Sequence, residues 1–144
     1  MILPIEYHGT PRSKGGDENV KSILVIDDDV GLRKALSIFL KLQYDVFSAA
    51  GVDEGIAIYE ECGADLVIID YQMPRKDGFK GIREFRARDR NLPIILLTAY
   101  GDEDTFKVAS ALGADDCMSK PFELDEVFRS LDERFSTPPP PKAA

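Results

Sequence analysis

The sequence has few of the residues that build disulfide frameworks, zinc sites or membrane spans. Its 144 residues include two cysteines, Cys62 and Cys117, and neither has a partner at metal-ligand or redox spacing. No apolar run approaches the roughly 20 residues needed to cross a bilayer. The apolar start of the chain is too short for a signal-peptide core and lacks a basic lead-in. These absences predict reduced thiols and a cytoplasmic location.

Positive charge is also in short supply. The chain carries 18 basic residues against 26 acidic ones, which gives a net charge of −8. An acidic surface repels phosphate backbones and anionic lipids, so we expect this domain to bind neither nucleic acid nor membranes. Apolar residues make up 44% of the chain, enough to fill the core of one ordinary domain.

The two ends of the chain differ in composition from its middle. Residues 1–21 contain glycine and proline without sustained periodicity, and we interpret them as a flexible extension, which also holds the single histidine, His8. Residues 136–144 include four consecutive prolines, which are typical of a stiff linker or tail. The predicted domain therefore spans residues 22–135.

Short apolar runs alternate with helical patterns through this domain. Continuous apolar runs are typical of strands buried on both faces. Five strands are predicted, at residues 23–26, 44–47, 66–69, 93–97 and 116–118. Helices are predicted after each strand, at residues 30–40, 52–61, around 79–85, 103–112 and 124–131.

The first predicted helix has an apolar face and a polar face. Leu32, Leu36, Phe39 and Leu40 repeat at helical spacing. A further set of basic residues, Arg33, Lys34 and Lys41, is predicted on the opposite, solvent side.

Five strands, each followed by a helix, predict an α/β fold with a doubly wound five-stranded parallel sheet and five helices. The common strand order for such a sheet is the flavodoxin-like 2-1-3-4-5. Five units are too few for an eight-stranded barrel. In open sheets of this kind ligands bind outside the carboxyl ends of the strands. Functional residues are therefore expected where the strands end.

Polar and charged residues follow four of the predicted strands. The first ends in Asp27-Asp28-Asp29, and the later ones end in Asp70, Thr98 and Lys120. Clustered carboxylates repel one another, so they favour a bound cation, and oxygen ligands suit Mg²⁺. Asp70 would then be an ionised nucleophile for phosphorus, while the metal, the ammonium and the hydroxyl neutralise the phosphoryl oxygens.

Each of these residues also has an ordinary structural interpretation. Aspartates after strands are commonly solvated turn residues or helix caps, and Asp29 is predicted to cap the helix that follows it. Thr98 alone suits a cap or a strand, and Lys120 alone suits an exposed surface. Their joint appearance, each at the end of a predicted strand, favours a site.

The chain resembles the receiver domain of two-component response regulators over residues 22–135. The resemblance lies in five segments taken in order, none of which is specific by itself. They are Ile23–Asp29, Val67–Pro74, Asp77-Gly78, Leu96–Ala99, and Gly113–Asp116 continued by Ser119-Lys120-Pro121.

The resemblance implies a role for each strand-end residue. Asp70 matches the phosphoacceptor, which takes a phosphoryl group from a phosphohistidine. Asp27 and Asp28 match the acidic pair for Mg²⁺, completed by Asp70 and the backbone carbonyl of Gln72. Lys120 matches the phosphate-binding lysine, and its bond to Pro121 is expected to be cis. Thr98 matches the hydroxyl that turns toward the phosphate on activation, beside the small residue Ala99.

The chain departs from the family pattern at one switch position. The family commonly has a tyrosine or phenylalanine three residues before the lysine, and here that residue is Cys117. A thiol cannot fill the volume of an aromatic ring, so the usual coupling between hydroxyl and aromatic does not carry over. Tyr100 is a candidate steric substitute. We also hypothesise that Gln72 and Tyr100 hinder the water that hydrolyses the phosphoryl group. A redox role for Cys117 is the weaker interpretation, because a lone strand thiol is usually a small buried hydrophobe.

Two other functions fit parts of the sequence. A Mg²⁺-dependent aspartyl-phosphate phosphohydrolase would use Asp27 and Asp29, which have the required spacing, but it leaves Asp70 unexplained and the chain has no room for a cap domain. A flavodoxin-like cofactor binder would need a phosphate-cradling loop after the first strand, where this chain has three aspartates. The sequence therefore favours a phosphoacceptor signalling domain that is not an enzyme in its own right.

The resemblance also implies partners. The phosphodonor would be a histidine kinase or a histidine phosphotransfer protein of a two-component phosphorelay, docking near the first helix. Output, or homodimerisation, would use the surface of the fourth helix, fifth strand and fifth helix. The proline run fits either the tail of a stand-alone receiver or a linker to an output domain.

Overall fold

Five parallel strands form one sheet in the computed structural model, which describes residues 20–99 and 101–136. The strands are β1 (Ser22–Ile26), β2 (Asp45–Ala49), β3 (Leu66–Asp70), β4 (Ile94–Thr98) and β5 (Asp116–Ser119). Their order across the sheet is β2-β1-β3-β4-β5. The predicted doubly wound sheet with the 2-1-3-4-5 order is confirmed.

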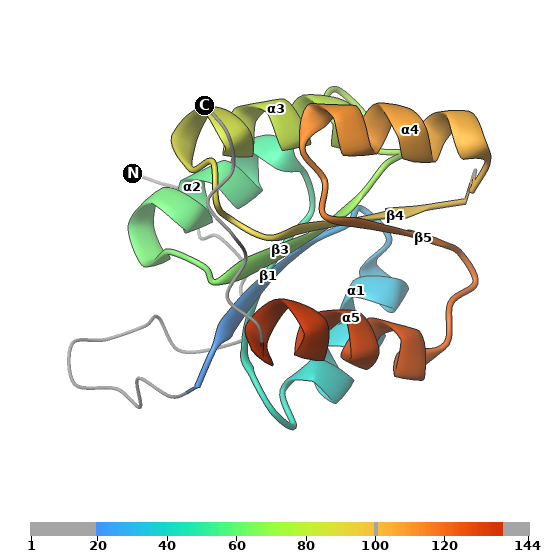
Figure 1. The fold of residues 1–144 in the computed structure, drawn as a ribbon. Coiled ribbons are helices and arrows are strands. Elements are labelled where there is room, and N and C mark those ends of the chain that lie inside the picture. Colours follow the sequence, from blue (N-terminus) through green and yellow to red (C-terminus); the bar gives the residue numbers. More distant parts are fainter. Residues whose placement is uncertain (1–19, 100, 137–144) are drawn as a thin grey trace.

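Helices cover both faces of this sheet (Figure 1). They are α1 (Val30–Leu40), α2 (Val52–Cys62), α3 (Gly78–Arg88), α4 (Glu103–Leu112) and α5 (Leu124–Ser136). Helices α2, α3 and α4 lie on one side, and α1 and α5 lie on the other (Figure 1). None of the helices in the described ranges is long and apolar enough to cross a membrane.

The two helical layers explain why the strands appear in the sequence as unbroken runs of apolar residues. Successive side chains of a strand point to opposite faces, so both faces must be apolar when both are covered. Leu24 and Ile26 of β1 pack with α2 and α3, whereas Ile23 and Val25 pack with α1 and α5. All four side chains are at most 1% exposed. The sheet is therefore the shared wall of two hydrophobic cores.

The register of the strands brings their carboxyl ends to one edge of the sheet. Ile26 pairs with Ile69, Asp70 pairs with Leu97, and Thr98 pairs with Ser119. The residues that follow these positions consequently meet at the same edge. This alignment is what the prediction of a strand-end site requires.

Two features of the predicted elements were wrong. The second strand was expected at residues 44–47, but β2 is Asp45–Ala49. On α1, Arg33 was expected to face solvent, yet it is only 5% exposed, whereas Phe39 from the predicted apolar face is 42% exposed. The helix is therefore rotated relative to the face that its apolar residues predict.

Several predictions lie outside the described residues. They concern most of the expected N-terminal extension with His8, the proline-rich segment after residue 136, and Tyr100.

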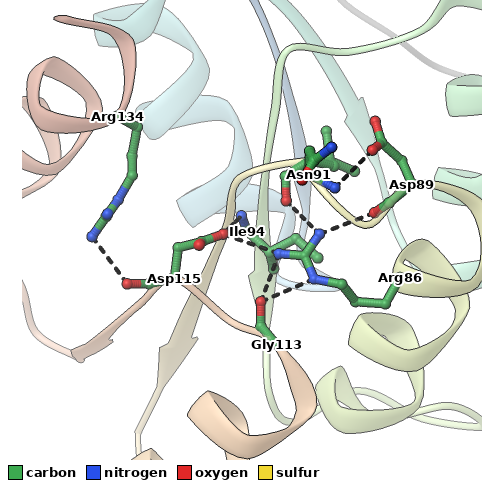
Figure 2. A network of polar contacts seen from close by, with 8 residues as sticks. Arg86, Asp89, Asn91, Ile94, Gly113, Asp115 and Arg134 are labelled. Carbon is green, nitrogen blue, oxygen red and sulfur yellow. Dashed lines mark hydrogen bonds and ion pairs between the residues drawn. The ribbon is translucent and has the colours of Figure 1, made fainter. Parts of the chain in front are cut away.

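A polar network closes the opposite, amino edge of the sheet (Figure 2). The guanidinium of Arg86 on α3 donates hydrogen bonds to the carbonyls of Gly113, Asp89 and Leu92, and to the carboxylate of Asp115. The same carboxylate accepts a bond from the backbone N–H of Ile94 at 2.9 Å. Arg86 thus ties the end of α3 to the starts of β4 and β5.

Candidate functional site

Three aspartates meet at the carboxyl edge of the sheet. Asp27 and Asp28 follow β1, and Asp70 ends the neighbouring strand β3. One carboxylate oxygen from each lies within 4.8 Å of the others. Asp27 and Asp70 are 2% and 4% exposed, while Asp28 is exposed. The structure therefore brings together the acidic residues that the sequence predicted.

Asp29 has a different position and a different task. Its carboxylate accepts a hydrogen bond of 3.1 Å from the backbone N–H of Leu32 and so caps α1. This agrees with the capping role predicted for Asp29. Because its carboxylate is engaged as a cap, the Asp27–Asp29 pair required by the phosphohydrolase interpretation gains no support from the structure.

Lys120 supplies the positive charge of the site. It follows β5, and its Nζ lies 2.9 Å from Asp70 Oδ1 and 3.1 Å from Asp27 Oδ2. Its backbone N–H donates to the carbonyl of Thr98, which fixes where the side chain starts. The Lys120–Pro121 peptide bond is cis, as the resemblance implies.

Burial and charge act in opposite directions on these groups. Removal from water raises the pKa of Asp70, and the neighbouring Asp27 and Asp28 raise it further, while the bond from Lys120 lowers it without cancelling the rise. Burial lowers the pKa of Lys120, but the bonds to Asp70 and Asp27 outweigh it and leave that pKa raised. Lys120 therefore stays cationic, while burial and the neighbouring carboxylates make the ionised form of Asp70 less favourable than it is in water.

Gly78 lets α3 begin directly against Asp70. A Cβ atom at this position would lie 2.7 Å from the Asp70 carbonyl oxygen, closer than such atoms approach in proteins. The Gly78 N–H also donates to the carbonyl of Tyr71 at 2.7 Å. This close approach accounts for the Asp77-Gly78 pair of the resemblance, in which Asp77 caps the helix through the N–H of Lys80.

Two further predicted residues lie at the carboxyl ends of β4 and β3. Thr98 is fully buried at the end of β4. Gln72 is exposed in the β3–α3 connection and lines a hollow of about 360 Å³ between that connection and the start of α4. Tyr100, its partner in the hypothesis on hydrolysis, is not among the described residues.

The acidic cluster fits a hard divalent cation. Its donors are carboxylate oxygens, which Mg²⁺ and Ca²⁺ prefer over softer metals. Three carboxylates and one ammonium leave a net negative charge in a largely buried place, which a divalent cation would offset. Nothing in the donor set suits zinc or copper, which favour nitrogen and sulfur ligands.

Cys117 occupies the middle of β5 and is half-buried. Burial, with a smaller contribution from Asp116, raises the pKa of its thiol to about 11. It lines a hollow of about 240 Å³ between β5 and α5, together with Arg129 and Glu133. The hollow therefore lies next to Cys117, at the position where the resemblance leads one to expect an aromatic ring.

The raised pKa makes a chemical prediction for Cys117. At neutral pH we expect a Cys62→Ser variant to react with iodoacetamide about a hundredfold more slowly than a free cysteine, because the thiolate is the reactive form. The rate should climb with pH until about 11. Mass spectrometry of the alkylated chain measures it. A rate that already levels off near pH 8 would contradict the prediction and revive a redox role.

Arg33 is the site residue that the sequence placed wrongly. Its Nη1 donates a 2.7 Å hydrogen bond to the backbone carbonyl of Asp27, beneath the acidic cluster. Its place among polar residues of α1 gave no reason to expect burial. The only sequence signal for this contact was the spacing of six residues between Asp27 and Arg33. At that spacing Arg33 lies one turn into the helix, and its long side chain can reach back to the Asp27 carbonyl.

Comparisons with known proteins agree with this geometry. The family model described as "Response regulator receiver domain" matches residues 23–132. Sporulation initiation phosphotransferase F of Bacillus subtilis is 34% identical over 108 residues, covering 74% of this chain and 87% of that protein. The chemotaxis protein CheY4 of Vibrio cholerae has a similar solved structure, with a TM-score of 0.76, 26% identity, and coverage of 79% of this chain and 98% of that one.

Other relatives are longer. The probable transcriptional regulator ycf27 of Cyanophora paradoxa is 39% identical over 124 residues, which are 83% of this chain and 52% of that protein. The chain thus spans about half the length of this relative.

Proposed function

Because the chain belongs to the response regulator receiver domain family, we propose that it accepts a phosphoryl group on Asp70. The observation that carries this proposal is the pairing of a buried strand-end carboxylate with Lys120 at 2.9 Å, inside a cluster of three aspartates. The donor would be the phosphohistidine of a histidine kinase or of a histidine phosphotransfer protein.

The proposed step exchanges one bond to phosphorus for another. An Asp70 carboxylate oxygen attacks phosphorus, the N–P bond of the phosphohistidine breaks, and its electron pair and a proton restore the neutral imidazole of the donor. Lys120 holds the attacking carboxylate in position and provides positive charge where the new phosphoryl oxygens arrive. The Thr98 hydroxyl, buried at the end of the adjacent strand, would bind one of these oxygens.

We assign Mg²⁺ to the acidic cluster. Asp27, Asp28 and Asp70 would hold it through their carboxylates, with the Gln72 carbonyl as a further ligand. When bound, the ion would neutralise charge on the transferred group. The side chains of Asp27 and Asp70, both buried, keep the site's oxygen donors in a fixed place.

The proposed activity is a single self-catalysed phosphorylation followed by slow hydrolysis, without turnover of an external substrate. Incubation with a small phosphodonor and Mg²⁺ should add one phosphoryl group to the chain, visible by mass spectrometry. Continuous release of phosphate from a phosphate ester, without an adduct, would support the phosphohydrolase instead.

The phosphodonor would dock on α1. Among the described residues, four of the five large apolar side chains that are most exposed lie on α1 or directly after it: Val30, Ile38, Phe39 and Leu42. Helix α1 begins beside the acidic cluster, so a protein seated on it brings its phosphohistidine to Asp70. Exposed large apolar side chains gathered on one helix are typical of a protein interface.

This assignment predicts that Ile38→Asp slows transfer from a phosphohistidine donor by about tenfold or more, because a charge enters an apolar contact. Phosphorylation by a small phosphodonor should not change. Val108→Asp on α4 is the matched control, since Val108 is 43% exposed but lies on another helix. Equal slowing by both variants, measured with radiolabelled donor, would exclude α1 as the docking surface.

Output would run through the surface of α4, β5 and α5, by homodimerisation or by contact with an effector.

We propose residues 22–135 as the receiver domain, with residues 1–21 as an extension and residues 136–144 as a tail or linker. A location in the cytoplasm, where kinases and their ATP are found, suits this role. We propose no binding of nucleic acid or membranes by the domain itself.

A further inference from the structure

Arg33 is a buried cation with few partners. Its side chain lies on the inward face of α1 and the residue is 5% exposed. Within the described part of the chain its guanidinium makes one hydrogen bond, from Nη1 to the Asp27 carbonyl, and its buried Nε has no partner there. Burying a guanidinium is costly unless its charge and donors are used. A leucine would fill this place at lower cost, as Leu36 and Leu40 do on the same face.

The bond from Arg33 completes the fixing of Asp27. The Asp27 N–H donates to Ala49 at 3.1 Å, Oδ1 accepts from the Asp29 N–H at 2.9 Å, and Oδ2 accepts from Lys120 at 3.1 Å. The carbonyl oxygen is left, and it accepts from Arg33 at 2.7 Å. Every polar atom of Asp27 therefore has a partner.

The carbonyl that Arg33 binds belongs to the peptide group joining Asp27 to Asp28. This oxygen is not part of the α1 hydrogen-bond ladder, whose first bond runs from the Arg33 N–H to the Asp29 carbonyl. A peptide group is planar, so holding its oxygen also sets the direction of the Asp28 nitrogen and Cα. The orientation of Asp28, which has no buried surroundings of its own, thus depends on Arg33.

We propose that Arg33 is a positioning residue for the metal site. It holds the Asp27–Asp28 peptide so that both carboxylates point toward Asp70, and its buried charge offsets part of the repulsion within the acidic cluster. This proposal rests on the proposed function, in which the cluster binds Mg²⁺.

The test compares Arg33→Met with Leu40→Ala in the full chain. Groups that orient metal ligands through hydrogen bonds typically change affinity 10–100-fold when they are removed. We expect Arg33→Met to raise the Mg²⁺ dissociation constant by about 10–100-fold in titration calorimetry. Leu40 is fully buried on the same helix about two turns away, so Leu40→Ala should destabilise the fold and leave the affinity unchanged.

A second readout uses the protein without metal. The amide nitrogen of Asp28 shares its peptide group with the oxygen that Arg33 binds, so its NMR chemical shift should move in Arg33→Met and stay in Leu40→Ala. Arg33→Lys keeps the charge but lacks the planar fork, and we expect an affinity between those of the native chain and Arg33→Met. If Arg33→Met does not fold, Arg33→Lys against Leu40→Ala carries the same comparison.

Three outcomes are distinguishable. Native affinity and an unmoved Asp28 signal in a folded Arg33 variant would overturn the proposal. So would an equal loss of affinity in Leu40→Ala, because the effect would then be one of general stability. Absence of saturable Mg²⁺ binding in the native chain would instead overturn the proposed metal site, and the Asp28 signal would still report whether Arg33 holds the peptide.

Discussion

Asp70→Asn is expected to abolish phosphorylation of this chain by a small phosphodonor in the presence of Mg²⁺. The substitution keeps the size of the side chain but removes the nucleophilic carboxylate. Asp27 is not expected to substitute, because both of its carboxylate oxygens accept hydrogen bonds, from the Asp29 N–H and from Lys120. The measurement is the mass increase of one phosphoryl group in the intact protein.

The matched control is Asp53→Asn, on the exposed first turn of α2. It removes a carboxylate of the same kind away from the cluster and should be phosphorylated like the native chain. An adduct of undiminished yield on Asp70→Asn would show that another group accepts the phosphate. Chelation of Mg²⁺ should suppress the adduct in the native chain as well.

The raised pKa of Asp70 gives this reaction a pH dependence with a definite sign. The ionised carboxylate is the nucleophile, so phosphorylation should fall as pH drops through the pKa that Asp70 has with Mg²⁺ present, which the cation would lower from its raised metal-free position. The raised pKa of Asp70 also means that ionisation of this residue lowers the free energy of unfolding. In metal-free protein that cost grows as pH rises from the unfolded value of 3.8 through the raised folded pKa. Asp70→Asn should therefore be at least as stable as the native chain at neutral pH, as chemical denaturation can verify.

Arg86→Met is expected to lower the free energy of unfolding by about 3–5 kcal/mol. The substitution removes five hydrogen bonds, one of them part of the ion pair with the Asp115 carboxylate, whose side chain is 15% exposed. The carbonyls of Gly113 and Asp89 lose donors at the same time (Figure 2). The carbonyl of Leu92 loses its donor as well. Since small domains are stable by about 5–15 kcal/mol, this is a large part of the total. Urea denaturation followed by circular dichroism measures it.

Arg88→Met provides the comparison two residues along the same helix. Arg88 pairs with Glu60 at 2.8 Å, but both side chains are exposed, 36% and 57%. Exposed ion pairs contribute about 0–1 kcal/mol. If the two variants lost similar stability, the Arg86 network would be no more than a surface ion pair.

The positions of the candidate site residues were predictable because they follow from one rule of parallel sheets. Buried strands appear in the sequence as apolar runs, and the residues that end them share an edge of the sheet. This rule predicts that Asp27, Asp70, Thr98 and Lys120 lie at one edge of the sheet, where the structure places them. The Asp29 cap likewise depends on local chemistry that a sequence displays directly. The strand order followed from the order that is common in sheets of this kind.

The burial of individual polar residues on helices was not predictable in the same way. Helical periodicity separates apolar from polar side chains, and on that basis Arg33 belonged to solvent and Phe39 to the core. The tertiary structure reverses both positions. For Arg33 the reason is that the Asp27 carbonyl lies outside the helix ladder and, among the described residues, Arg33 is its hydrogen-bond donor. Arg86 is a second case, since its acceptors come from segments up to 29 residues away.

The sequence by itself therefore determined the fold, the edge of the sheet that carries the candidate site and the residues that end the strands there. Only the tertiary structure decided that Lys120 bridges Asp27 and Asp70, that Arg33 is turned inward beneath them and that Arg86 closes the opposite edge. The physical reason is that helical periodicity in a sequence separates apolar side chains from polar ones. It does not show which distant backbone oxygens require a hydrogen-bond donor after folding. Arg33 and Arg86 both lie where they donate to such oxygens.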